Sequence, residues 1–145
     1  KQQPFVEKLF APAGFRPRFV IAVDIAAENL LPQDYSGSVD LCIDHHGAGE
    51  IYADHFIRPE AAATGEIMFD LVKQLATEER VEITDSLCTA LYAAISSDTG
   101  CFKYSNVSSH THLCAADLIK AGIDAAEINH RLFDCKSEKI YRCNY

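Results

Sequence analysis

The chain has 145 residues, is 48% hydrophobic and carries a formal net charge of −8. A chain of this length and composition can bury one continuous apolar core, which predicts a single domain. The acidic balance argues against a surface for long nucleic acids, which are bound through basic residues, but it is compatible with a small phosphorylated ligand held through divalent cations.

The first part of the chain predicts one short helix and three strands. Residues 4–10 predict an amphipathic helix, and residues 19–23 predict a buried strand that ends at Asp24. After a polar loop, a second apolar run over residues 39–43 ends in three consecutive ionisable residues. A third strand over residues 51–57 alternates between polar and apolar residues, which predicts a position at or near a sheet edge.

From residue 61 the apolar spacing changes from about two to about 3.6, which predicts helices. The first helix runs to about residue 76, and its predicted apolar face comprises Ile67, Leu71, Val72 and Leu75. Three further helices are predicted from their N-caps, which are Thr84, Ser108 or Ser109, and Asp124. They are expected to end near residue 96, at residue 120 before Gly122, and near residue 133.

Strands followed by helices predict an α/β fold with a parallel sheet, in which the first two strands are central and helices cover both faces. In open parallel sheets, ligands bind beyond the carboxyl ends of the strands. Asp24 and the run Asp44-His45-His46 both lie at such ends. Asp98 also follows an apolar segment, in a tight turn that Gly100 permits.

The run Asp44-His45-His46 is the most unusual feature, because three ionisable side chains directly after a buried strand are costly unless they bind something. Neighbouring side chains of an extended segment point to opposite sides, so one histidine is expected to bind a metal ion and the other to face the substrate. Asp44 is expected to orient the ligating ring. The alternatives are a loop with solvated histidines and, for Asp24, a turn cap. Together with Asp98, these residues offer oxygen and imidazole donors that suit manganese or magnesium.

The six cysteines contain no Cys-x-x-Cys pair, which argues against zinc-ribbon and redox sites. Cys42, Cys88 and Cys114 lie in apolar runs and are predicted to be buried. The sequence shows neither an apolar run of the roughly 20 residues that a membrane span needs nor the apolar segment of a signal peptide. These features predict a cytoplasmic protein with reduced thiols and no membrane partner.

The order and spacing of Asp24, Asp44-His45-His46 and Asp98 resemble motifs two, three and four of the DHH phosphoesterase superfamily. The resemblance extends from about residue 19 to about residue 132 and includes residues 61–67 and 98–104. Within the superfamily, the chain is most similar to the oligoribonuclease (nanoRNase) and phosphoadenosine-phosphate phosphatase branch. Family II inorganic pyrophosphatases are the nearest competing branch, but they usually carry a bulky aliphatic residue where Gly100 stands.

The resemblance implies hydrolysis of phosphoester bonds in short oligonucleotides or nucleoside bisphosphates by a water that two manganese ions activate, with magnesium or cobalt as alternatives. It implies that Asp24, His45 and Asp98 are metal ligands, that His46 contacts the substrate phosphate, and that these four residues are the catalytic ones. Arg58 and Lys103 are further candidates for contacts with the substrate. A pyrophosphatase and a non-catalytic metal- or nucleotide-binding module stay open as alternatives.

The chain departs from the family pattern before Asp24. The resemblance implies a first motif with a histidine and two aspartates, but residues 1–23 contain neither residue type. Residues 1–17 are therefore interpreted as a lead-in helix and loop, residues 18–135 as a partial DHH domain, and residues 136–145 as the start of a linker to a substrate domain outside the chain. The sequence leaves the oligomeric state open, a homodimer included. His110 and His112 are interpreted as solvated residues of a helix start.

Overall fold

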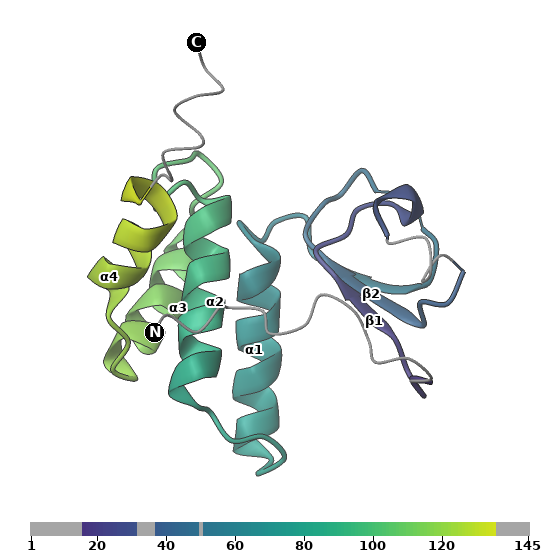
Figure 1. The fold of residues 1–145 in the computed structure, drawn as a ribbon, viewed down its shortest axis with the longest axis horizontal. Helices are drawn as coiled ribbons and strands as arrows, with labels where there is room; N and C mark the ends of the chain where they lie inside the picture. The colour runs from purple at the N-terminus through teal and green to yellow at the C-terminus, as the bar shows by residue number, and fades with distance from the viewer. Residues whose placement is uncertain (1–15, 32–36, 50, 136–145) are drawn as a thin grey trace.

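The computed structural model describes residues 16–31, 37–49 and 51–135. The helix predicted over residues 4–10 and the linker predicted over residues 136–145 lie outside these residues. A small parallel sheet comes first along the chain, and a group of helices follows it (Figure 1). This mixed architecture with a parallel sheet confirms the predicted fold class.

The sheet has the strand order β1-β2-β3, with β1 over Ile21–Val23, β2 over Leu41–Asp44 and β3 over Asp54–Ile57. Both pairings are parallel. The parallel arrangement of the first two strands and the edge position of β3 are therefore confirmed. One part of the prediction was wrong for the described residues: β2 alone is central, and β1 forms the second edge.

The prediction that β1 is buried is confirmed for one of its faces only. Ala22 is 4% exposed, whereas Ile21 is 51% and Val23 41% exposed. In parallel pairs the side chains of partner residues lie on the same face, so Ile21 and Val23 share a face with Ile43 of β2. The first helix packs on this face over β2, where Ile67 contacts Ile43, and it leaves β1 uncovered by residues that the structure describes.

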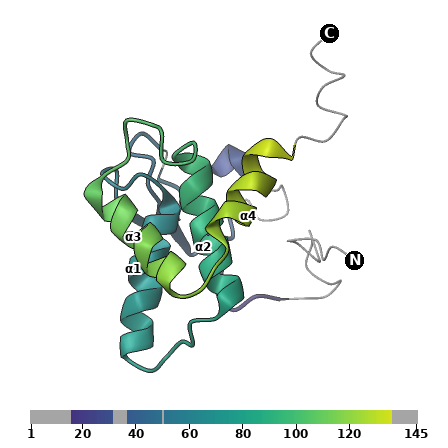
Figure 2. The same ribbon diagram turned by 90° about the vertical axis from the view of Figure 1, so that its left-hand side faces the viewer.

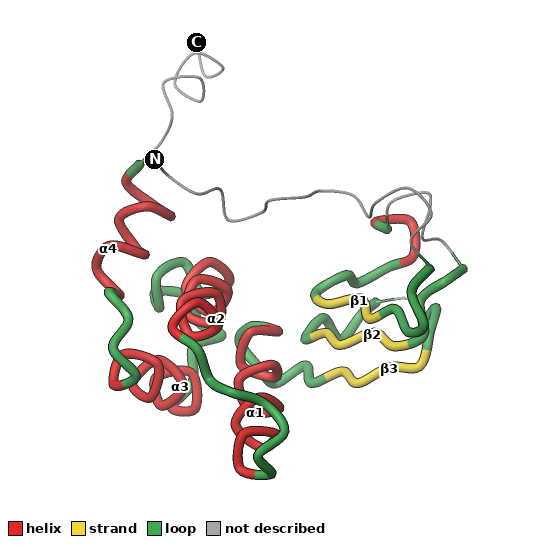
Figure 3. The backbone as a smooth tube through the Cα atoms, turned by 60° about the horizontal axis from the view of Figure 1, so that its bottom comes forward, coloured by secondary structure: helices red, strands yellow, loops and turns green. Residues whose placement is uncertain are grey.

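The four predicted helices are all present, and their bounds are α1 Thr64–Thr77, α2 Asp85–Asp98, α3 Ser109–Lys120 and α4 Ala125–Asn129. A π-helical turn, His130–Asp134, continues α4. Three caps are confirmed: Thr84, Ser108 and Asp124 accept hydrogen bonds from backbone N–H groups of the first helical turns. Among the described residues, these helices gather on one side of the sheet, so helices on its other face stay a prediction (Figure 3).

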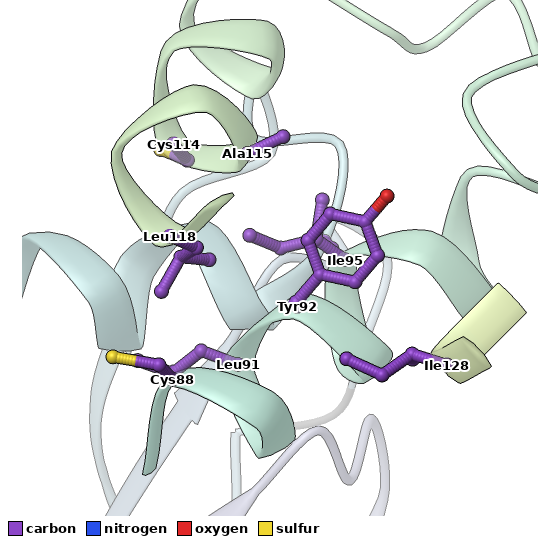
Figure 4. Close-up of a cluster of buried hydrophobic side chains, with 9 residues drawn as sticks. Cys88, Leu91, Tyr92, Ile95, Cys114, Ala115, Leu118 and Ile128 are labelled. Carbon is purple, nitrogen blue, oxygen red and sulfur yellow. The ribbon is translucent and has the colours of Figure 1, made fainter. Parts of the chain in front are cut away.

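The main apolar core lies among the helices, with α2 at its centre, because α2 contacts α1, α3 and α4 (Figure 2). Figure 4 shows its side chains converging from three helices; the buried residues drawn include Cys88, Leu91, Tyr92, Ile95, Cys114, Ala115, Leu118 and Ile128. The predicted burial of Cys42, Cys88 and Cys114 is confirmed. Within the described residues, the helices are too short or too polar to cross a membrane.

Gly65 allows α1 and α2 to pack closely at the end of α1 that faces the sheet. A Cβ atom at this position would lie 3.0 Å from the Cβ of Ala94 and 3.0 Å from the Cγ1 of Ile95. A side chain there would push the two helices apart. The close approach brings the start of α1 near the end of α2, and thus near Asp98.

Candidate metal centre

Asp24 follows β1 directly and adopts a backbone conformation that is rare for aspartate. Its φ is 62°, in the left-handed region, while its N–H donates to the carbonyl of Ile43 at 3.0 Å. Strained backbone of this kind is often found at functional sites, where the surrounding structure holds it. The turn directs the Asp24 carboxylate toward the end of β2, where its Oδ1 lies 3.7 Å from Nε2 of His45.

His45 presents one ring nitrogen to two carboxylates. Its Nδ1 lies 3.1 Å from the carbonyl oxygen of Ala61, so Nδ1 carries the proton and donates it to that oxygen. Its Nε2 lies 3.7 Å from Oδ1 of Asp24 and 3.6 Å from Oδ2 of Asp98. A histidine that donates from one nitrogen to a backbone carbonyl and leaves the other free toward carboxylates has the tautomer of a metal ligand.

Asp44 is the buried anchor of this region. It is 1% exposed, and its Oδ1 accepts from the backbone N–H of His45 at 2.6 Å, from the backbone N–H of His46 at 3.0 Å and from Nδ1 of His46 at 2.7 Å. Burial alone would raise the pKa of Asp44, but these hydrogen bonds outweigh it and lower the pKa below its ordinary value. Asp44 was expected to orient the ligating ring. The ring that it holds is instead that of His46, because residues two apart in an extended segment point the same way.

His46 is half exposed, and nearby carboxylates favour the protonated form of its imidazole. Its hydrogen bond to Asp44 raises the pKa of its imidazole, partly offset by burial, and the carboxylates of Asp44, Asp24 and Asp98 raise it further. Because Nδ1 is engaged by Asp44, Nε2 is the N–H that can reach a ligand. An imidazole N–H at an exposed rim can donate to a ligand oxygen.

Asp98 faces His45 from α2, with its Oδ2 3.6 Å from Nε2 of His45. It is the last residue of α2, which extends two residues beyond its predicted end. Burial, and next the negative charge of Asp24, raise the pKa of Asp98, while His45 and His46 partly counteract them. A carboxylate also meets the negative end of the helix dipole here. A bound cation would offset the effects that disfavour the charged form of Asp98.

The turn after Asp98 is built from left-handed backbone. Gly100, Cys101 and Phe102 have φ values of 55°, 59° and 61°. A Cβ at position 100 would lie only 2.4 Å from the ring of Tyr104, so glycine is required by both conformation and space unless that ring moves. The tight turn predicted at Gly100 is confirmed.

Thr64 is a site residue to which the sequence analysis gave no role. It is 2% exposed at the first position of α1, and its hydroxyl donates to Oδ1 of Asp24 at 2.9 Å and lies 3.4 Å from Oδ1 of Asp44. It therefore ties the ends of β1 and β2 to the start of α1. A threonine at the start of a predicted helix, within the stretch that resembles the family, was the available signal.

The donor set fits a hard divalent cation. Carboxylate oxygens and an imidazole nitrogen are the ligands of manganese and magnesium sites, and Asp24, Asp44, His45 and His46 each place one donor atom within 4.8 Å of the others. In the part of the chain that the structure describes, the ion pairs of Asp24 and Asp98 are with the two histidines only. The negative charge is therefore not neutralised by lysine or arginine.

Arg58 and Lys103 are placed differently from the histidines. The guanidinium of Arg58 donates to Asp70 at 2.7 Å and to Glu60 at 3.3 Å, so it is held against α1. This engagement does not favour a phosphate contact by Arg58, which stays a prediction. Lys103 lies exposed in the turn after Asp98, and its contact with substrate also stays a prediction.

Replacement of His46 by glutamine is expected to destabilise the metal-free protein in a defined pH window. The pKa of His46 is raised in the folded protein, so the ion pair adds to the free energy of unfolding. This stabilisation is complete below pH 6.5, the ordinary pKa of histidine, and is lost as the pH rises through the pKa of His46 in the folded protein. The pKa of Asp44 is lowered in the folded protein. Its stabilisation is complete above pH 3.8, the ordinary pKa of the group, and is lost as the pH falls through the pKa of Asp44 in the folded protein. Because His46 is half exposed, the expected loss is a few tenths of a kcal/mol.

Urea unfolding in the presence of a chelator at about pH 5.5 and about pH 9 measures this loss, which should be larger at the lower pH. His55→Gln, at an exposed position of β3, is the matched control and should show little pH-dependent difference from wild type. A His46→Gln effect that is equal at both pH values would contradict the assigned ion pair.

Comparisons with known proteins agree with the motifs and the fold. The family described as "DHH family, N-terminal domain" matches residues 2–95. A bifunctional oligoribonuclease and PAP phosphatase of Thermus thermophilus is 34% identical over 91 residues, which are 62% of this chain and 27% of that protein. A probable protein of the same description from Streptococcus mutans is 31% identical over 116 residues, which are 78% of this chain and 36% of that protein. The chain thus spans about a third of the length of these relatives.

Two solved structures share the fold. An exopolyphosphatase-related protein of Bacteroides fragilis superimposes with a TM-score of 0.70 at 22% identity, over 84% of this chain and 38% of that one. A putative family II inorganic pyrophosphatase of Methanococcus jannaschii gives a TM-score of 0.62 at 24% identity, over 74% of this chain and 39% of that one. At these identities the similarity concerns the fold alone.

Proposed function

The chain belongs to the DHH family, and on that premise we propose that its protein hydrolyses phosphoester bonds in short oligonucleotides or nucleoside bisphosphates with the help of manganese ions. The observation that carries the proposal is the position of Nε2 of His45, which lies 3.7 Å from Asp24 and 3.6 Å from Asp98. The names of the relatives from Thermus thermophilus and Streptococcus mutans support the substrate class.

Asp24, His45 and Asp98 are the residues that would hold the metal. When bound, divalent cations lower the pKa of a coordinated water and offset the charge of a phosphoryl group. Asp24 also accepts from Thr64, and His45 donates to the Ala61 carbonyl, so both ligands are oriented before any ion arrives. Preorganised donors avoid reorganisation during the reaction.

His46 would bind and orient the substrate phosphate. Asp44 fixes its ring and favours the protonated form, which leaves the Nε2–H free to donate to a phosphate oxygen. The half-exposed position of His46 at the rim suits a ligand that enters from solvent. The net charge of −8 disfavours long polynucleotides, so a short substrate fits the chain as a whole.

The turn at Gly100 favours phosphoester hydrolysis over the pyrophosphatase alternative. The resemblance implies a bulky aliphatic residue at this position in pyrophosphatases, whereas any Cβ here would lie 2.4 Å from the Tyr104 ring. A cytoplasmic location, which the free cysteines favour, and a homodimer belong to the proposal as well.

A hydrolysis assay on the protein with its complete reading frame tests the proposal. With manganese, a dinucleotide or adenosine 3′,5′-bisphosphate should be hydrolysed at least about tenfold faster than pyrophosphate, because the relatives are named for action on oligoribonucleotides and PAP. Faster hydrolysis of pyrophosphate would favour the pyrophosphatase instead. Manganese binding without hydrolysis of any of the three substrates would favour a non-catalytic binding module.

A further inference from the structure

A second group of metal-ligand side chains lies between α1 and α3, outside the DHH motifs. Asp70 comes from α1, and His110 and Cys114 come from α3; each offers one ligand atom, and these atoms lie within 4.8 Å of one another. Nε2 of His110 lies 3.2 Å from both carboxylate oxygens of Asp70 and 3.5 Å from Sγ of Cys114. His110 was expected to be a solvated residue of the helix start; its side chain is 43% exposed and also contacts this group.

The helix geometry explains why these residues meet. His110 and Cys114 are four residues apart and therefore lie on one face of α3. One turn further along both helices, Lys73 of α1 donates to Asp117 of α3 at 2.6 Å, so the two helices run side by side in the same direction. Polar side chains therefore meet at two levels between α1 and α3. At the first level Asp70 faces His110 and Cys114, and at the second Lys73 binds Asp117.

Glu66 adds an independent observation. It lies one turn before Asp70 on the same face of α1 and is 1% exposed. Its Oε1 has no hydrogen-bond partner among the residues that the structure describes. Burial and next the negative charges of Asp70 and Glu66 raise the pKa of the Cys114 thiol. A buried carboxylate oxygen without a partner is costly, and the charge of a cation held at Asp70, one helical turn away, would offset part of that cost.

The two distances from Nε2 of His110 match those of a tetrahedral zinc site. Bonds of about 2.0 Å to nitrogen and oxygen and about 2.3 Å to sulfur, at tetrahedral angles, separate a nitrogen and an oxygen ligand by about 3.3 Å and a nitrogen and a sulfur ligand by about 3.5 Å. The corresponding separations here are 3.2 Å and 3.5 Å. His110 would therefore need little movement relative to Asp70 or Cys114 to share an ion with either residue.

The neighbouring arginine and lysine side chains leave the three ligand residues accessible to an ion. Arg58 donates to Oδ2 of Asp70 at 2.7 Å, so Oδ1 stays available toward His110. Lys73 is engaged by Asp117. The side chains of Asp70 and His110 are 34% and 43% exposed, which provides a path for an ion from solvent.

We propose that Asp70, His110 and Cys114 bind a zinc-class divalent cation that links α1 to α3. A thiolate, an imidazole and a carboxylate are ligand types of such an ion, in contrast to the oxygen-rich donor set at Asp24. Binding would release the thiol proton of Cys114 to solvent. Because its ligands come from two helices, the bound ion would stabilise the packing of α1 against α3.

Titration of the protein with Co²⁺ alone tests the inference, because cobalt bound to a thiolate absorbs in the near ultraviolet whereas cobalt bound at the Asp24 centre through oxygen and imidazole does not. The wild type should develop this band, and Cys114→Ser should lose it. Cys88→Ser, a buried cysteine of the same core, and Cys101→Ser, the thiol that follows Asp98 most closely, should both retain it. Asp24→Asn should also retain it, which separates this site from the proposed catalytic one.

His110→Gln provides a second variant at a half-exposed position, where folding is expected to tolerate the change. It should weaken cobalt binding at least about tenfold, as measured by the midpoint of the near-ultraviolet titration. Absence of the band in the wild type, its persistence in Cys114→Ser, its loss in Cys88→Ser, or an unchanged midpoint in His110→Gln would each overturn the inference. Circular dichroism of every variant verifies that it is folded.

Discussion

Asp24→Asn should weaken Mn²⁺ binding at least about 100-fold, and should lower phosphoester hydrolysis by the protein at least as much. The change removes the negative charge of the group that faces Nε2 of His45 at 3.7 Å. Asparagine has nearly the same shape and tolerates the left-handed backbone, so the φ of 62° at this position should be kept. The loss should therefore reflect the missing charge.

Calorimetric titration with Mn²⁺ measures the first effect, and the dinucleotide assay measures the second. Asp54→Asn is the matched control, because Asp54 is an exposed aspartate at the beginning of β3, the end of the sheet that lies away from the metal centre. The control should bind Mn²⁺ like the wild type. Equal affinities of Asp24→Asn and the wild type would contradict the assignment of Asp24 as a ligand.

Ile95→Ala should lower the free energy of unfolding by about 2–5 kcal/mol, since it removes a large side chain from a fully buried position. Ile95 is 0% exposed and lies at the centre of the core among the helices (Figure 4). It also contacts the position where Gly65 brings α1 and α2 together. Asp98 follows one turn later on α2, so the cavity should also loosen the carboxylate at the metal centre.

Urea unfolding of the metal-free protein at 25 °C gives the change in stability, provided that the dependence on urea concentration is the same for both proteins. Ile119→Ala on α3 serves as the control, because Ile119 is 47% exposed. Its expected effect is below about 1 kcal/mol. A similar loss for the two variants would show that the core is not centred on α2.

The features that the sequence predicted well depend on local rules. The alternation of apolar residues and the change to helical spacing located all three described strands and α1 to α4, and capping residues such as Thr84 and Asp124 marked helix starts within one residue. Because parallel strands end at the same edge of a sheet, the meeting of Asp24 with His45 could also be foreseen. These relations need no knowledge of how distant helices pack.

The features that were missed depend on packing between distant segments. Thr64 reaches Asp24 across 40 residues, and His110 reaches Asp70 across 40 residues as well; no spacing rule connects such pairs. The exposure of Ile21 and Val23 was also missed. The apolar residues of a strand indicate that it can be buried, but they do not indicate whether another segment covers it. Asp44 was expected to orient the ring of the metal-binding histidine, and its Oδ1 in fact lies 2.7 Å from Nδ1 of His46, two residues further along the extended segment.

Strain and unfavourable charge coincide at the candidate metal centre. Asp24, Cys101 and Phe102 all have positive φ, and both burial and Asp24 raise the pKa of Asp98. The fold elsewhere stabilises this arrangement through the core around α2. Such a concentration of costly features at one rim of a sheet is expected where a bound cation compensates for them.

The most direct test of the central claim is the anomalous diffraction signal of manganese in crystals of the protein grown with Mn²⁺. We expect a peak bonded to a carboxylate oxygen of Asp24, to Nε2 of His45 and to a carboxylate oxygen of Asp98, with Nδ1 of His45 still donating to Ala61. Manganese bound elsewhere with none among these three side chains, or a structure in which they lie apart, would contradict the account.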